Sequence, residues 1–334
     1  MSLSIIIVNY RSATYIINAI QSAVEHHQSN SYEWIVVDNA SGDDSKQLIL
    51  SKFPFVNWID MGYNAGFARA NNEGIRQSTR DVVLLLNPDV VIKSNAIEDC
   101  YNRFINSNHV ACGVQLLNID GSSQISGSYF MKGGLNHLLP LPYWGSFLRW
   151  VAFLFNTEKP SIEKAIEEEP VDWISGAFLM VRKSVIKQAG MMDEDFFLYA
   201  EEVEWCSRLK KIGSLCIYGK LNIIHILGET IKDATQTNDK TYTNLFDKKG
   251  LQLIVSNHVR IRKQYGLTWF LFQLFNYSFA VFVFFLFSIL YNLFHLKNPF
   301  NEWNKITGLA KNVLIVWMLT PTIINNKPHF YKVL

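Results

Sequence analysis

Short apolar runs alternate with helix-like stretches along the first part of the chain, and this alternation most restricts how the chain can fold. Leu3 to Val8 is rich in β-branched residues and precedes a helix-like stretch from Thr14 to Glu25. The pattern recurs with Glu33 to Asp38, and with Val56 to Asp60 before Gly66 to Ser78. Strands that alternate with helices predict an α/β fold with a mostly parallel, Rossmann-like central sheet flanked by helices.

A further strand is predicted at Asp81 to Leu86, where a continuous apolar run of the kind buried on both faces ends abruptly in polar residues. In open α/β sheets, ligands bind beyond the carboxyl ends of the strands. Four polar residues lie at or just after predicted strand ends: Asn9, Asp38, Asn64 and Asp89. We therefore expect these four side chains to converge on one crevice.

Three carboxylates occupy the otherwise apolar and aromatic segment from Phe196 to Cys206. They are Glu201, Glu202 and Glu204. Because burying a carboxylate is costly, such a cluster indicates a functional site. We predict a helix from Glu202 to Ile212, on which Glu204 forms an ion pair with Arg208 at i, i+4 spacing.

The middle of the chain is less regular. Residues 129 to 155 contain Gly133-Gly134, two prolines and several aromatics, and they predict a long loop or partial lid. Order resumes with a predicted strand from Phe178 to Val181, followed by two short strands, Leu215 to Tyr218 and Leu221 to His225.

Composition excludes several classes of protein. The 334 residues are 49% hydrophobic, enough for a real core, while a net charge of +2 and no arginine-rich stripe argue against a nucleic-acid partner. The four cysteines lack CxxC spacing and are interpreted as reduced core thiols in a cytosolic setting, without structural zinc. The first residues lack the features of a signal peptide, so we expect the catalytic part to stay in the cytoplasm.

A composition shift marks the final third. Thr268 to Leu296 contains no Asp, Glu, Lys or Arg and is long enough to cross a bilayer. A second run, Val313 to Leu319, is short for a span and is followed by Pro321; it pairs with the first as a hairpin or lies in the interface. The alternative is a very apolar buried helix, but we favour membrane contact. We accordingly expect a catalytic domain at 1–265 and a membrane-associated region at 266–334.

Six motifs, taken together in their order and spacing, resemble family 2 glycosyltransferases with the GT-A fold. The similarity is to the bacterial rhamnosyltransferase-like enzymes of surface polysaccharide synthesis, and it covers roughly residues 1 to 265. The motifs are Ile5–Tyr10, Val37–Ser41, Asn64–Asn72, Leu86–Asp89, Ser175–Ala177 and Glu201–Glu202.

This resemblance implies a nucleotide-sugar donor, dTDP- or UDP-linked. Asp38 would contact the base or ribose, with Asn9 beside it, although a turn or helix-capping aspartate is equally compatible with the residue type. Asn64 and Gly66 would let the backbone approach the nucleotide. Arg69 would meet phosphate, or else face solvent on a helix.

The resemblance also implies a divalent metal, Mg²⁺ or Mn²⁺, because Asn87-Pro88-Asp89 stands where related enzymes carry an Asp-x-Asp motif. Asp89 would be a metal ligand, and Asn87 a substrate contact in place of the first acid. His225 begins a segment, 225–230, similar to the family's His-x-x-Gly-x-Ser/Thr. That histidine would complete the metal shell, or else be a satisfied structural group.

Catalysis in the family is inverting, and the resemblance assigns the general base to Glu202. The usual family pair is Glu-Asp, so Glu201-Glu202 makes the base one methylene longer. Glu201 would bind the acceptor or the donor sugar, and Trp173 would supply a surface on which a sugar ring rests.

We therefore expect a membrane-associated glycosyltransferase at the cytoplasmic face of the cell membrane, with a lipid-linked glycan acceptor and rhamnose as the first expectation for the donor sugar. Two alternatives stay open. One is a catalytically degenerate, membrane-associated scaffold that binds nucleotide sugars. The other is a nucleotidyltransferase, although the segment after the first strand lacks the glycine-rich basic loop that such enzymes use.

Overall fold

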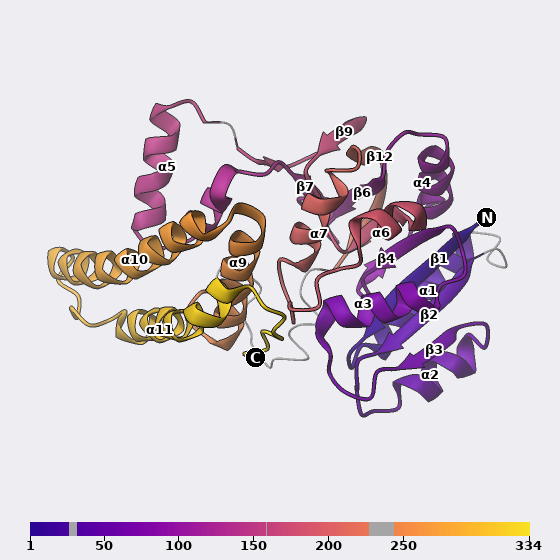
Figure 1. Ribbon diagram of the computed structural model, residues 1–334, viewed down its shortest axis with the longest axis horizontal. Helices are drawn as coiled ribbons and strands as arrows, with labels where there is room; N and C mark the ends of the chain where they lie inside the picture. Colours follow the sequence, from indigo (N-terminus) through magenta and orange to yellow (C-terminus); the bar gives the residue numbers. More distant parts are fainter. Residues whose placement is uncertain (27–31, 158, 227–243) are drawn as a thin grey trace. The chain divides into compact units, whose positions relative to one another are not determined.

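A computed structural model describes residues 1–26, 32–157, 159–226 and 244–334 of the chain (Figure 1). The chain divides into two compact units. The first, here called the α/β unit, comprises residues 1–129, 161–197 and 201–240. The second, the helical unit, comprises residues 130–160, 198–200 and 241–334. Each unit therefore draws on parts of the chain that are distant in sequence.

Within the described residues, nine strands of the α/β unit form one mixed sheet. Along the sheet the order is β3-β2-β1-β4-β11-β6-β12-β5, and β9 also pairs with β12. These strands are β1 (Leu3–Asn9), β2 (Glu33–Asp38), β3 (Asn57–Asp60), β4 (Val82–Leu86), β5 (Val90–Val91), β6 (Ala111–Leu117), β9 (Glu168–Val171), β11 (Phe178–Arg182) and β12 (Leu215–His225).

The register of the sheet decides which residues meet at its edge. β1 is parallel to both β2 and β4, with Asn9 opposite Asp38. β11 runs antiparallel to β4 and β6, and β12 runs parallel to β6. The carboxyl ends of β1, β2, β4, β6 and β12 therefore lie along one edge, together with the residues that precede β11.

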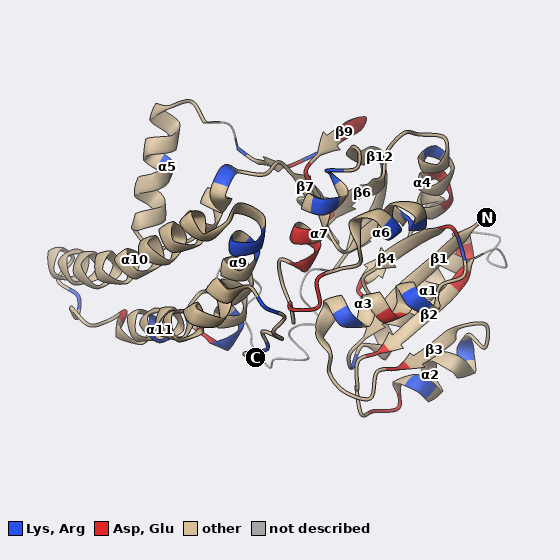
Figure 2. Ribbon diagram, viewed as in Figure 1, with Lys and Arg blue, Asp and Glu red and all other residues tan. Residues whose placement is uncertain are grey.

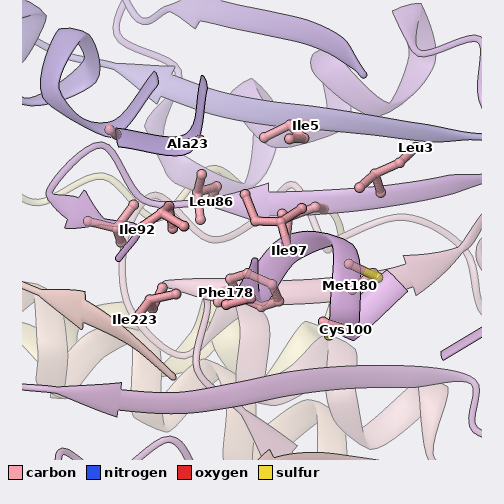
Figure 3. Close-up of a cluster of buried hydrophobic side chains, with 14 of the residues drawn as sticks. Leu3, Ile5, Ala23, Leu86, Ile92, Ile97, Cys100, Phe178, Met180 and Ile223 are labelled. Carbon is pink, nitrogen blue, oxygen red and sulfur yellow. The ribbon is translucent and has the colours of Figure 1, made fainter. Parts of the chain in front are cut away.

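Helices of the α/β unit pack on the sheet through apolar faces. They are α1 (Ala13–His26), α2 (Ser45–Lys52), α3 (Gly66–Gln77), α4 (Ala96–Ile105), α6 (Lys183–Ala189) and α7 (Glu201–Leu209). Figure 3 shows part of the core, a buried cluster to which Leu3 and Ile5 of β1, Ala23 of α1 and Ile97 of α4 all belong. The strands β1 and β4 are buried along almost their whole length, because both faces of the sheet are covered.

A second, three-stranded sheet has the order β10-β7-β8, with β7 (Gly127–Ser128), β8 (Ser161–Ile162) and β10 (Trp173–Ile174). The backbone N–H of Ser175 donates to the carbonyl of Ser126 at 2.9 Å, just beyond the β7–β10 pairing. This small sheet fixes the chain immediately before Gly176 and Ala177.

The helical unit contains α5 (Trp144–Leu154), α9 (Lys248–Tyr265), α10 (Leu267–Phe294) and α11 (Trp303–Asn325), with a short 3₁₀ segment η2 (Lys132–Leu138). α10 packs against α9 and α11. Gly266, at φ +91°, joins α9 to α10 with the backbone in the left-handed region that favours glycine. In the structure, α9 thus belongs to the same unit as the C-terminal helices. The sequence analysis instead expected α9 to end the catalytic domain, with a domain boundary between residues 265 and 266.

Three expectations about secondary structure were wrong. Residues 129–155 are not a long loop, because Gly133 and Gly134, at φ +66° and +67°, form a turn inside η2 and α5 follows. Residues 215–225 form one strand with a register shift between Tyr218 and Asn222, rather than two short strands. The second apolar run is part of α11, a helix of 23 residues that includes Pro321.

Candidate active site

Asn9 and Asp38 meet at the carboxyl edge of the sheet, as the sequence predicted. Asn9 Nδ2 donates to Asp38 Oδ1 at 2.7 Å and to Ser41 Oγ at 3.0 Å. Ser41 donates its hydroxyl to Asp38 Oδ1 at 2.5 Å and its backbone N–H to Asp38 Oδ2 at 3.2 Å. Both carboxylate oxygens of Asp38 are thus held within the fold, so the side chain is fixed in position. Whether it contacts a nucleotide base stays a prediction.

Asn64 and Gly66 shape the start of α3 next to this network. Asn39 Nδ2 donates to Asn64 Oδ1 at 3.1 Å, and the same oxygen accepts from the backbone N–H of Gly66 at 3.2 Å. Gly66 has φ +78°, and a Cβ there would lie 2.2 Å from the carbonyl oxygen of Phe197. Only glycine fits this position, because the segment before α7 packs directly on the α3 N-terminus.

Asp89 and His225 form a second group at the same edge. β5 pairs antiparallel with β12, with His225 opposite Val90, and the N–H of Ile226 donates to the carbonyl of Asp89 at 2.8 Å. This pairing brings His225 Nε2 to 3.4 Å from Asp89 Oδ1, and both side chains are buried. The remainder of the predicted His-x-x-Gly-x-Ser/Thr segment, 227–230, lies outside the described residues.

Gln124 sets the tautomer of His225. Its Nε2 donates to the carbonyl of His225 at 2.6 Å and to Asn118 Oδ1 at 2.8 Å, which fixes which end of the amide is nitrogen. Oε1 therefore faces His225 Nδ1, at 3.0 Å, and accepts its proton. When Nδ1 is the donor nitrogen, Nε2 can present a lone pair, and Asn87 Nδ2 lies 3.3 Å from it.

These residues fit a divalent cation. An imidazole nitrogen and a carboxylate oxygen face each other at 3.4 Å, a pair of atom types that serves as ligands for divalent cations. Adjacent ligands on an ion with bonds of about 2.1 Å lie roughly 3 Å apart, close to this separation. Asp89 and His225 can therefore supply two protein ligands.

Glu202 lies on the first turn of α7, across from the loop that precedes β11. A Cβ at Gly176 would lie 3.5 Å from the Phe67 ring and 3.8 Å from Glu202 Cγ. The next residue, Ala177, accepts a hydrogen bond from the N–H of Asn87 at 3.1 Å. The 175–177 loop thus connects the surroundings of Glu202 to the end of β4, just before Asn87 and Asp89.

Glu201 is buried, with 3% of its surface exposed, and its Oε2 has no hydrogen-bond partner among the described residues. Desolvation, followed by the neighbouring charge of Glu202, raises the pKa of Glu201 well above its usual value. Burial thus favours the protonated form of Glu201, which can donate a hydrogen bond. Glu204 instead pairs with Arg208 at 2.8 Å, which confirms the predicted ion pair.

Arg69 and Trp173 are the last two of the side chains that the sequence predicted for the site. Arg69 Nε donates to the carbonyl of Glu194 at 3.0 Å, so part of its guanidinium holds the 191–195 loop. Trp173 is half-buried in β10, and its indole N–H has no hydrogen-bond partner among the described residues. Contacts of these side chains with phosphate or sugar stay predictions.

Two functional candidates were missed by sequence reasoning. Ser41 lies within a motif that resembles the family, and its hydroxyl turned out to join Asn9 to Asp38. Gln124 lies in the turn after β6, and nothing in its local sequence distinguishes it. Only the register of β6 with β12 could have placed it beside His225.

Comparisons with known proteins identify the family of this chain. The family model for glycosyl transferase family 2 matches residues 4–188. The low-salt glycan biosynthesis hexosyltransferase Agl10 of Haloferax volcanii is 33% identical over 218 residues, 63% of this chain and 62% of the relative. N-acetylglucosaminyl-diphospho-decaprenol L-rhamnosyltransferase of Mycobacterium tuberculosis is 30% identical over 201 residues, 55% of this chain and 62% of the relative. The chain thus spans less than two thirds of the length of these relatives.

A solved structure supports the fold. The mannosyltransferase PcManGT from Pyrobaculum calidifontis, in complex with GDP-Man and Mn²⁺, has a TM-score of 0.52 at 11% identity, covering 95% of this chain and 87% of that chain. The expected GT-A fold is therefore confirmed. The family model covers more than half of the residues, and by that match this chain belongs to glycosyl transferase family 2.

Proposed function

We propose that the protein is an inverting glycosyltransferase that moves a sugar, with rhamnose the first candidate, from a dTDP- or UDP-linked donor to a lipid-linked glycan acceptor in cell-surface polysaccharide synthesis. The observation that carries this proposal is the placement of Glu202 and of the Asp89–His225 pair at one edge of the sheet. The names of the relatives, which include rhamnosyltransferases and one enzyme of a decaprenol-linked substrate, support the substrate classes.

The donor would lie along the edge, with its nucleoside over the Asn9–Asp38–Ser41 network and its diphosphate toward β4. Gly66 permits close approach of the backbone there, and Arg69 adds a positive charge. Asp89 and His225 would hold Mg²⁺ or Mn²⁺, which neutralises charge on the departing nucleotide diphosphate. Asn87 then orients His225 or contacts the donor directly.

Glu202 would act as general base. An acceptor hydroxyl attacks the anomeric carbon, the bond from that carbon to the nucleotide diphosphate breaks, and the hydroxyl proton passes to the Glu202 carboxylate. Because attack comes from the face opposite the leaving group, configuration inverts. Glu201, protonated in its buried position, would donate a hydrogen bond to a sugar oxygen, and Trp173 would offer a ring surface.

The reaction is proposed to take place at the cytoplasmic face of the cell membrane. α10 and α11 are long and apolar enough to cross a membrane, by length and composition. A lipid-linked acceptor is confined to a membrane surface, so an enzyme associated with that surface meets it in two dimensions rather than three.

The test is a binding titration of the purified protein against a panel of nucleotide sugars, with and without Mn²⁺. We expect one donor to stabilise the wild type in a metal-dependent manner and Asp89→Ala to lose most of that stabilisation. Glu204→Ala is a matched control, since it removes a carboxylate engaged with Arg208. Failure of every nucleotide sugar to bind would refute the proposal, and metal-independent binding would refute the role of Asp89.

A further inference from the structure

We propose that the helical unit binds one anionic membrane leaflet in the plane of the bilayer, with α5 inserted into that leaflet and neither α10 nor α11 spanning it. This inference deepens the membrane location proposed above. It does not depend on the transfer chemistry.

α5 is an almost entirely apolar helix that its own unit leaves uncovered. Of its eleven residues only Gly145 is buried and only Arg149 is charged. Trp150 is 57% exposed, and Phe153 and the following Phe155 are each 78% exposed. A helix of this length is about 16 Å long and cannot cross a hydrocarbon core of about 30 Å. It is nevertheless suited to insertion into a single leaflet.

α10 has two faces of opposite character. Its polar side chains point into the helical unit. Gln273 Nε2 donates to the carbonyl of Gly133 at 2.8 Å, and Tyr277 donates to the carbonyl of His137 at 3.0 Å. Asn276 Oδ1 accepts from the indole N–H of Trp144 at 3.0 Å. These bonds attach η2 and α5 to one side of α10.

The hydrogen bonds that join η2 to α10 argue against a position of α10 across the bilayer. If α10 crossed the bilayer, η2 would have to enter the hydrocarbon with it, together with the exposed side chain of Lys132. A charged side chain is costly in the hydrocarbon core. A helix in the plane of the membrane avoids this cost, since η2 can remain on the aqueous side.

The other face of α10 is aromatic and exposed. Phe275, Phe282 and Leu286 recur at helical spacing on this face, and Phe294 is 85% exposed at its end. Trp144 stacks with Phe147 of α5 and meets Phe279 of α10 edge-on. α5 and the exposed face of α10 therefore form a connected aromatic surface, here called the aromatic face.

The net charge of the helical unit favours anionic lipid as the occupant of this face. The helical unit contains thirteen Lys and Arg residues against three Asp and Glu, a formal net charge of +10. The α/β unit contains eighteen against twenty-six, a net charge of −8. Figure 2 shows basic residues on α5, α9 and α11, and acidic residues at the start of α7. A basic unit with an exposed aromatic face is attracted to an anionic leaflet.

The first experiment locates the connection between α10 and α11. The four native cysteines are buried, so a cysteine introduced at Asn298 can be labelled selectively with a membrane-impermeant maleimide. In spheroplasts of cells that express the full chain, we expect labelling only after lysis. Ile119→Cys, 70% exposed in the α/β unit, is the matched control and should behave identically.

A spanning hairpin would give the opposite result, because it places residue 298 on the outside and labels it in intact spheroplasts. Protection of residue 298 after lysis, with residue 119 labelled, would place the connection inside the bilayer and also overturn the proposal. Neither readout requires turnover. A failed transferase assay with the expected labelling would count against the function alone.

The second experiment tests the occupant. Phe153→Cys carrying an environment-sensitive fluorophore should shift to the blue with vesicles that contain phosphatidylglycerol, and much less with phosphatidylcholine alone or at high salt. Phe153→Asp should reduce co-sedimentation with anionic vesicles at least tenfold. Equal shifts on both lipids would refute charge recognition. A shift without vesicles that disappears on dilution would instead assign the face to a second copy of the chain.

Discussion

The helical unit of this chain leaves more large apolar side chains exposed than the α/β unit does. In the α/β unit, Leu84 and Leu85 of the central strand are fully buried. In the helical unit, Gln252 and Gln273 are fully buried while Phe153 is 78% exposed. The hydrophobic effect favours the first arrangement in water. Exposed aromatic side chains are disfavoured in water, and the proposed contact with a membrane accounts for this difference between the units.

The largest expected effect separates chemistry from folding within the α/β unit. Glu202→Gln should lower turnover by roughly 10³-fold, because general base catalysis contributes about 10²–10⁴-fold, while donor binding is unchanged. Single-turnover rates and donor titrations measure the two quantities. Near-normal turnover in Glu202→Gln would exclude this residue as the base. Glu204→Gln should leave turnover within a few fold of the wild type.

A pair of truncations contrasts the two units directly. Leu84→Ala, in the fully buried β4, should cost about 2–5 kcal/mol in the free energy of unfolding, from lost burial and the cavity left behind. Phe153→Ala removes a larger side chain but should change the stability in detergent by less than about 0.5 kcal/mol. Thermal and chemical denaturation of both variants would decide. Equal destabilisation would mean that Phe153 is covered within the protein and would break the comparison.

Gln124 allows a finer test, of how the side chain of His225 is positioned in the α/β unit. Gln124→Leu frees the tautomer of His225 and should weaken Mn²⁺ binding about 10–100-fold, as loss of an outer-shell partner does. Mn²⁺ titration and the nitrogen chemical shifts of His225 report affinity and tautomer separately. Asn118→Ala keeps Gln124 in place and should have a smaller effect. An unaltered tautomer with weakened binding would indicate a merely structural role for Gln124.

The smallest predicted effect concerns pH. The pKa of Glu201 is raised in the folded state, so the folded protein holds this proton more tightly than the unfolded chain does. The stabilisation is fully present below the unfolded pKa and is lost as pH rises through the folded pKa. Glu201→Gln should therefore gain stability over the wild type more at pH 8 than at pH 5. A constant difference in melting temperature across that range would contradict the assignment.

Much of the sheet could be predicted from the sequence because its strands are short, apolar and ended by polar residues. The end of β1 met the end of β2 as expected, since parallel neighbours in register bring Asn9 opposite Asp38. The local sequence pattern could not predict that Gln124 lies beside His225, because this contact depends on β6 and β12 being neighbours in the sheet. Local pattern also failed for α5. The glycines and prolines near it predicted a loop, although the helix itself is a nearly continuous run of apolar residues.

The pairing of β5 with β12 also constrains when the site can come into being. Asp89 and His225 are distant in sequence, and their backbones are joined by only a two-residue strand and its hydrogen bonds. During synthesis, a nascent chain that has not yet emerged past His225 has only one of the two proposed metal ligands. The proposed site is therefore complete only in a chain in which β12 has paired with β5.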